Sequence, residues 1–161
     1  DAEAKKIELA KIAATAKVTA QITMPNKVVK AEGIHPTQSS PKILVERSLM
    51  DWAAAWSNKN VHDYLSAYAY YFKPKGLSQE KRKKQRAERI SKPKIIVVSL
   101  SNIAINVQDE NHVSVTFIQH YRSDDYQDEV EKSLLMVKEF DRWLIAKENV
   151  LDATNKMAAS N

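Results

Sequence analysis

The sequence predicts an α+β domain in which three helices come first and about four antiparallel strands follow. Apolar residues recur at spacings of three and four from residue 42 to about residue 72, which is typical of helices. From Lys94 the period changes to two, which is typical of strands. No helical stretch separates the strands, so a curved antiparallel sheet is expected, with the helices packed on it.

The ends of the chain differ from its middle. Residues 1–22 are rich in Ala and Lys, without Gly or Pro, and predict a peripheral helix or tail. Residues 23–42 hold three of the five prolines and predict a linker. The folded domain is expected over residues 43–150, and residues 151–161 are expected to be a loose tail. The chain begins with Asp1, which indicates a processed chain or a fragment.

The three predicted helices are separated by clear breaks. The first runs from Lys42 and ends at "SNKN", residues 57–60. The second is expected from about Val61 to Phe72, where "KPKG" stops it. The third is strongly charged, with Ser78 as a plausible N-cap, and reaches about Ile90.

The strand region divides at two turns. Residues 94–108 are rich in β-branched side chains and predict one long or bulged strand. Residues 112–123 alternate, which places His120 on the face opposite Val113, Val115, Phe117, Gln119 and Tyr121. A hairpin is expected around Asp141.

Seven of the twelve aromatic residues lie between Trp52 and Phe72. At helical spacing such residues more often fill a core than line a pocket. We therefore expect one core, with its inner edge forming a binding cavity, and Tyr70 off that face and exposed. The predicted core residues are Trp52, Trp56, Leu65, Tyr68, Phe117, Leu135 and Trp143.

Composition excludes several kinds of chemistry. With only two glycines the chain cannot build a Gly-rich phosphate loop, and without cysteine it has neither disulfides nor thiolate catalysis. The four histidines show no metal-binding spacing, so neither a metal nor another cofactor is expected. No apolar run approaches the roughly 20 residues of a transmembrane helix. No catalytic residue is assigned.

Three stretches together resemble a nuclear transport factor 2-like domain: "DWAAAWSNKNVHDYLSAYAYYFKP", "GLS…QRAERI" and "VTFIQHYRSDDYQDEVEKSLLMVKEFDRWLIAKE". They are most similar to the version appended to bacterial L,D-transpeptidase-type proteins and cell-shape peptidoglycan carboxypeptidases, which also occurs in tetratricopeptide envelope proteins. The resemblance covers about residues 43–150. One departure is Arg82, where family members tend to carry Trp.

The resemblance implies a cystatin-like cone with a pocket at its wide end, in the periplasm or cell envelope of a Gram-negative bacterium. It implies a non-catalytic binding or scaffolding module that is accessory to peptidoglycan-modifying machinery, with a peptidoglycan fragment or an envelope protein as partner. It also implies a homodimer through the open face of the sheet. The alternative is a small cone-fold enzyme of isomerase or dehydratase type that acts on an apolar ligand.

The predicted ligand pocket is polar at its inner edge. Gln119 needs several hydrogen-bond partners on a covered strand face, and tyrosine hydroxyls could supply some of them. Arg89 could bind a carboxylate such as that of a peptide stem. The five candidates for the lining are Tyr64, Tyr68, Arg89, Gln119 and Tyr121.

The third helix offers a further alternative. Residues 81–94 carry eight Lys or Arg against one Glu, and the basic side chains fall all around the helix, so a solvated face is the default. The helix 79–92 could instead bind an anion through Lys81, Arg82, Lys84 and Arg86. It lacks the interleaved aromatic residues of single-strand binders, which argues against nucleic acid.

Overall fold

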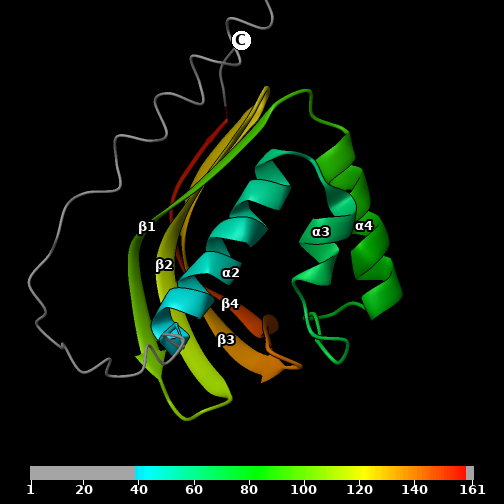
Figure 1. Cartoon of the computed structure of the whole chain (residues 1–161). Coiled ribbons are helices and arrows are strands. Elements are labelled where there is room, and N and C mark those ends of the chain that lie inside the picture. The colour runs from blue at the N-terminus through cyan, green and yellow to red at the C-terminus, as the bar shows by residue number, and fades with distance from the viewer. Residues whose placement is uncertain (1–38, 159–161) are drawn as a thin grey trace, which may run out of the picture. The chain divides into compact units, whose positions relative to one another are not determined.

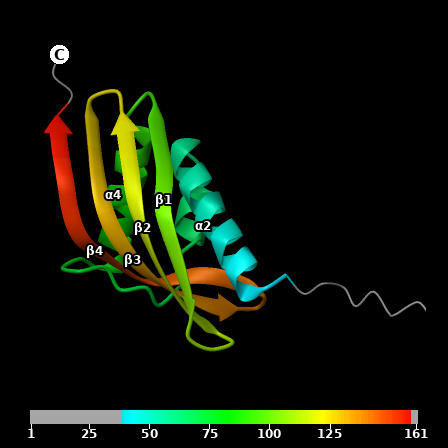
Figure 2. The ribbon, with the colours of Figure 1, turned by 90° about the vertical axis from the view of Figure 1, so that its left-hand side faces the viewer.

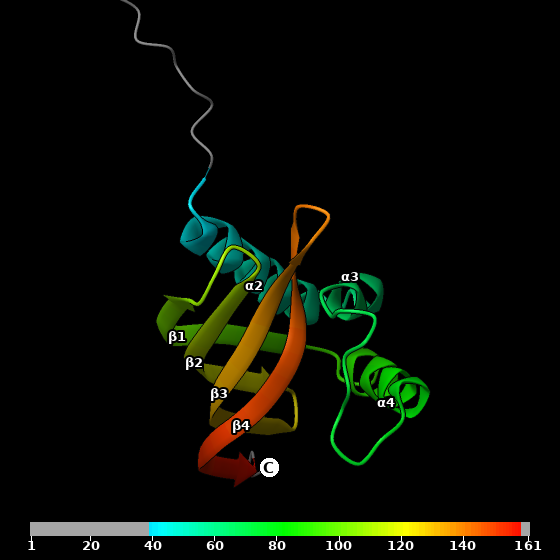
Figure 3. The same ribbon diagram turned by 90° about the horizontal axis from the view of Figure 1, so that it is seen from below.

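A computed structural model describes residues 39–158, with side chains described through residue 151. The predicted segment 1–22 and most of the predicted linker lie outside this range. Three helices lie on one side of a four-stranded antiparallel sheet, and Figure 2 shows the other side without helices (Figures 1 and 3). The predicted fold class is therefore confirmed. The elements are α2 (Pro41–Ser57), α3 (Val61–Ser66), α4 (Gln79–Ser91), β1 (Ile96–Val107), β2 (His112–Ser123), β3 (Tyr126–Glu139) and β4 (Arg142–Ala158).

The first helix, α2, starts and stops where the sequence predicts. The Ser40 hydroxyl accepts the Ile43 N–H at 3.5 Å, and Pro41 fills a first-turn position that needs no N–H donor. Lys59, at φ 58°, takes a left-handed conformation within the predicted break. The Ser57 hydroxyl accepts the Val98 N–H at 2.9 Å, which fixes the end of α2 to β1.

The second helix is shorter than predicted. It ends at Ser66 instead of Phe72, because the next residues pair with the sheet. The Ala69 N–H donates to the Ile145 carbonyl at 2.9 Å, and the Ile145 N–H donates to the Ala67 carbonyl at 2.8 Å. These strand-like bonds replace the helical ones that the aromatic spacing predicts.

The sheet has the order β1-β2-β3-β4, with each strand paired to the next in sequence. The register of β1 and β2 shifts between Ser101 and Ala104, so the predicted bulge is present. The C-terminal tail was predicted wrongly, because β4 pairs with β3 as far as Ala158. Tyr126 is the partner of Ala158 at that end of the sheet.

The core lies between the helices and the covered face of the sheet. Of the predicted core residues, Trp52, Trp56, Tyr68, Phe117 and Trp143 are buried. Leu65 is only partly buried and packs against this core, whereas Leu135 is partly buried against a separate small cluster of Ala69, Val137 and Ala146, which corrects the prediction for both. Tyr70 is 82% exposed, as expected. No helix in residues 39–158 is long and apolar enough to cross a membrane.

Candidate functional site

A cavity of about 700 Å³ lies between α4 and the covered face of the sheet. Trp56 of α2 and Ile90 of α4 supply apolar walls, and β2 contributes Gln119 and Tyr121. Its size is within the usual range for small-molecule sites. We call it the inner cavity.

The five predicted pocket residues fall into two groups. Gln119, Tyr121 and Arg89 line the inner cavity, with Gln119 buried, Tyr121 partly buried and Arg89 exposed. Tyr64 and Tyr68 are buried in the core instead of lining the cavity. Their hydroxyls are 3.1 Å apart, and the Tyr68 hydroxyl donates to Oε2 of Glu148 at 2.9 Å.

The basic helix α4 presents two arginines to the interior. Arg82 and Arg86 are four residues apart and share the face of buried Ile90, which is eight residues after Arg82. The Arg82 guanidinium lies 4.0 Å from the centroid of the Tyr68 ring, and the residue is 6% exposed. The prediction that the basic side chains of this helix are solvated is therefore wrong for Arg82 and Arg86. Lys81 and Lys84 are exposed, as predicted.

Lys132 of β3 is a buried cation that sequence reasoning missed. It is 6% exposed, and its Nζ lies 3.9 Å from Oε1 of Glu148 and 5.6 Å from the centroid of the Trp56 ring. Burial lowers the pKa of Lys132 from its usual value, although Glu148 opposes this effect. Lys132 lies on the same buried face of β3 as Val130 and Leu134, because side chains alternate between the two faces of a strand. This alternation, read from the sequence, could have indicated that Lys132 is buried.

The interior charges do not balance. Arg82, Arg86 and Lys132 are buried or partly buried, and the partly buried carboxylates that act on them are Glu148 and, farther along β3 from Lys132, Asp128. Burial disfavours the charge of Arg86, but the Tyr64, Tyr68 and Glu148 oxygens raise its pKa above the usual value. Among residues 39–151, the only salt bridge within 4.0 Å in this group joins Lys132 to Glu148. The interior therefore favours an additional anion.

Two buried acceptors that line the inner cavity lack a hydrogen-bond donor. These are Oε1 of Gln119, a residue 3% exposed, and Oδ1 of Asp128. The other oxygen of Asp128 accepts the Tyr126 hydroxyl at 3.1 Å. Buried acceptors without donors are costly, so both atoms favour a ligand or solvent that donates.

The histidine predicted to point away from the pocket does so. His120 lies on the uncovered face, where its Nε2 is 2.8 Å from the Ser101 hydroxyl and its Nδ1 is 2.9 Å from Oε2 of Glu129. This is the connectivity of a serine–histidine–acid relay. His120 and Glu129 side chains are 40% and 42% exposed, and strand register already pairs them. A cross-strand polar network explains the arrangement fully. No group of residues that could hold a metal ion occurs in the described range.

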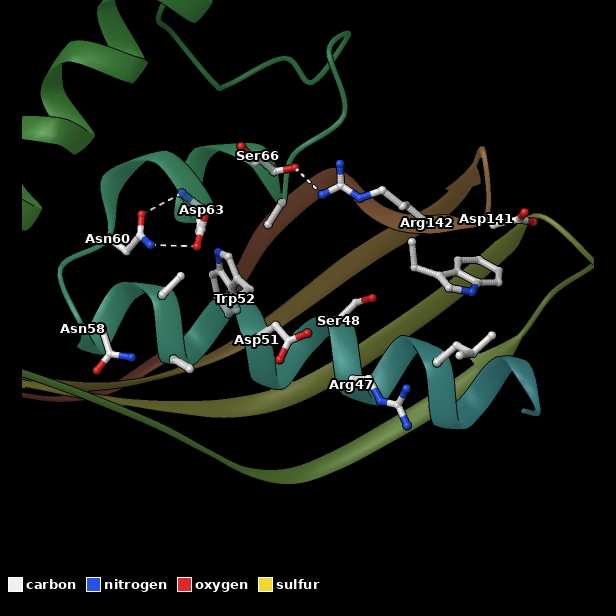
Figure 4. A pocket seen from close by; sticks show the side chains of 15 residues that line it. Arg47, Ser48, Asp51, Trp52, Asn58, Asn60, Asp63, Ser66, Asp141 and Arg142 are labelled. Carbon is white, nitrogen blue, oxygen red and sulfur yellow. Dashed lines mark hydrogen bonds between the residues drawn. The ribbon is translucent and has the colours of Figure 1, made fainter. Parts of the chain in front are cut away.

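A second hollow, of about 580 Å³, lies among α2, α3 and the β3–β4 turn (Figure 4). Its charged side chains, including Arg47, Asp51 and Arg142, are exposed, so solvent screens them. The Arg142 guanidinium donates to the Ser66 carbonyl at 3.5 Å, and the Asn60 side chain bonds to Asp63. The inner cavity, with its buried and unbalanced charges, is the stronger candidate.

A helical layer on a curved sheet, with a polar cavity between them, defines the cone-shaped class of α+β domains. Residues 44–149, more than half of the chain, match the family model of the Cds6 C-terminal NTF2-like domain, and the chain belongs to this family. The resemblance predicted from the sequence is thereby confirmed. A search of curated proteins found no match.

Solved structures agree with this assignment. Bd1075 from Bdellovibrio bacteriovorus is 28% identical with a TM-score of 0.61, covering 66% of this chain and 38% of Bd1075. Pgp2, a helical cell shape determining protein from Campylobacter jejuni, is represented by a K307A mutant. That structure is 22% identical with a TM-score of 0.60, covering 65% of this chain and 39% of Pgp2. This chain therefore spans less than two fifths of either protein.

The same fold also occurs in proteins solved as candidate enzymes. One from Novosphingobium aromaticivorans, described as a candidate scytalone dehydratase, is 13% identical with a TM-score of 0.61. The match covers 74% of this chain and 88% of that one. At this identity the likeness shows the fold alone.

Proposed function

We propose that this domain is a non-catalytic binding module of the bacterial cell envelope, and that its inner cavity binds a small anionic ligand such as a peptidoglycan fragment. The observation that carries the proposal is the buried excess of positive charge around Glu148. Arg86 and Lys132 are placed to bind a carboxylate, and such charge-assisted bonds are strong when water is excluded.

The envelope setting is supported by the likeness to Pgp2, a cell shape determining protein. The match covers only part of Pgp2, so the activity of the longer protein is not transferred here. A periplasmic location and dimerisation through the uncovered face of the sheet belong to the same proposal. The uncovered face presents the 41% exposed Val97 as one apolar contact for such a dimer.

The test is a titration of the full chain with soluble peptidoglycan fragments. Amide chemical shifts report on Gln119, Tyr121 and Lys132. Tryptophan fluorescence is the sum over Trp52, Trp56 and Trp143, of which Trp56 lines the inner cavity. We expect shifts at the inner cavity, and at least about tenfold weaker binding by Arg86→Gln. The matched control is Lys81→Gln on the exposed side of α4, which should bind normally. Shifts confined to Lys81 and Lys84 would contradict the proposal and favour the anion-binding helix.

A cone-fold enzyme is the second candidate, and one observation favours it. Glu148 is a largely buried carboxylate that accepts a hydrogen bond from the Tyr68 hydroxyl and pairs with Lys132 at 3.9 Å, and an acid–base site requires an ionisable group with such partners. Glu148 is already engaged by both neighbours, which makes it a poor free base. Conversion of any bound fragment to a product that Glu148→Gln no longer forms would establish the enzyme instead.

A further inference from the structure

The floor of the inner cavity is ordered along the strands. Register pairs Lys132 with Phe117, Val130 with Gln119 and Asp128 with Tyr121, so Gln119 lies between the cation and the carboxylate. Asp128 and Lys132 are four residues apart and face the same side of β3. Their Cα atoms are therefore about 13 Å apart. A cation thus marks one end of the floor, and a carboxylate marks the other.

The two ends of the floor need opposite partners. At the deep end, Lys132 and Arg86 outnumber Glu148 and favour an anion. At the other end, Asp128 has one buried oxygen without a donor, and no cation within 4.0 Å among residues 39–151. Gln119 adds a second acceptor without a donor near the middle. Because a carboxylate and an amide oxygen both accept hydrogen bonds, a group with N–H donors and positive charge satisfies this end.

We infer that the inner cavity takes a short zwitterionic peptide, with its carboxylate at Lys132 and Arg86 and its ammonium at Asp128. This inference rests on the proposed function and names the chemical class of its ligand. Two or three extended residues span roughly 7–10 Å, which suits the distance between the charged ends once side chains reach inward. The Gln119 amide then bonds to a peptide group between them.

The experiment compares four forms of trialanine against the full chain: free, N-acetylated, C-amidated, and blocked at both ends. Amide shifts of Gln119 and Lys132 and tryptophan fluorescence give the dissociation constants. We expect the free peptide to bind most tightly, and each single block to weaken binding at least about tenfold. The doubly blocked peptide should not bind measurably. N-acetylation removes the ammonium, and C-amidation removes the carboxylate, so each block addresses one end.

Two variants test which residues bind each end of the peptide. Asp128→Asn keeps the size of the side chain, and it should bind free and N-acetylated trialanine with equal affinity. Arg86→Gln should instead reduce the difference between the free and C-amidated peptides, with the remaining difference due to Lys132, and should leave the effect of N-acetylation unchanged. Glu110→Gln, an exposed change in the β1–β2 turn, is the control and should keep every preference. Circular dichroism confirms that each variant is folded.

The outcomes separate this inference from the proposed function. If N-acetylated trialanine binds at Gln119 as tightly as the free peptide, the zwitterion is wrong while anion binding stands. If only larger peptidoglycan fragments shift Gln119, the short peptide is wrong and the proposed function again stands. If neither trialanine nor any peptidoglycan fragment shifts the inner cavity, both are overturned.

Discussion

The two faces of the sheet treat polar side chains differently. On the uncovered face, Ser101, His120 and Glu129 complete one another through contacts of 2.8 and 2.9 Å while half-exposed to water. On the covered face, one residue before His120, Gln119 is 3% exposed and its side-chain oxygen Oε1 has no hydrogen-bond donor. Adjacent residues of one strand thus enter opposite environments.

This difference separates polar groups that stabilise the sheet from those available for binding. A cross-strand polar pair in water contributes roughly 0.2–1 kcal/mol and needs nothing further. A buried acceptor without a donor costs about 1–3 kcal/mol, which a matching ligand removes. The covered face therefore gains from a ligand, whereas the uncovered face does not.

The largest expected effect is a loss of packing on the covered face. Trp56 is 7% exposed, and its ring lies 5.4 Å from that of Tyr64 and 5.5 Å from that of Tyr121. Trp56→Ala should lower the free energy of unfolding by about 3–5 kcal/mol, measured by denaturant titration. On the uncovered face Val97→Ala should change it by less than about 0.5 kcal/mol. Equal effects would contradict the contrast between the faces.

The next effect concerns the buried carboxylate. Glu148→Gln removes the carboxylate that pairs with Lys132 and lies nearest to Arg86, so we expect a loss of about 2–4 kcal/mol. Glu129→Gln, the matched change on the uncovered face, should cost less than about 1 kcal/mol because its partner is solvated. Thermal and chemical unfolding of both variants measure the difference. A Glu148→Gln variant as stable as the parent would show that water already solvates these cations or that bound anions already neutralise them.

The sequence predicts which side chains lie on each face only where the pattern that indicates it is local. Alternation along β2 correctly separates Gln119 from His120, because strand period is local. The spacing of aromatic residues wrongly extends the second helix, because the pairing of Tyr68 with Ile145 joins segments distant in sequence. Nothing local signals that bridge. For the same reason the sequence wrongly predicts that Tyr64 and Tyr68 line the pocket, whereas in the structure both are buried in the core.

Charge is harder to predict than apolar packing. Arg82 and Arg86 belong to a helix whose basic residues surround it, and only their phase with Ile90 marks them as interior. Lys132 is revealed by alternation within β3, whereas Glu148 follows a register shift between β3 and β4 that no periodicity anticipates. The candidate site is thus predicted in part, through Gln119, Tyr121 and Arg89, while its buried charges come from the fold.

A smaller effect appears at alkaline pH. Burial raises the pKa of Tyr64, and it raises that of Tyr68 well above its usual value. The unfolded chain releases these protons near pH ~10, so above it the folded state binds more protons. The free energy of unfolding must therefore fall as pH rises from about 10 towards the raised pKa values.

Tyr68→Phe should make this alkaline decline less steep. Lys132, whose pKa is lowered, acts with the opposite sign below pH ~10.5 in both proteins. The comparison of parent and variant therefore isolates the tyrosine contribution. Denaturant titrations across the alkaline range, with tyrosinate absorbance in parallel, measure it. An identical decline in both proteins would mean that Tyr68 ionises freely in the folded state.

The smallest expected effect is at Ser101, where we expect no covalent reaction with a fluorophosphonate probe. A nucleophilic serine needs a base that is oriented and shielded from water, and here His120 is 40% exposed. Ser101→Ala should change the free energy of unfolding by no more than about 1 kcal/mol, through its lost bond to His120. Intact-mass measurement after incubation with the probe decides the matter. Labelling of the parent that Ser101→Ala and His120→Ala both lose would make the uncovered face an acyl-transfer site and reverse the comparison between the two faces.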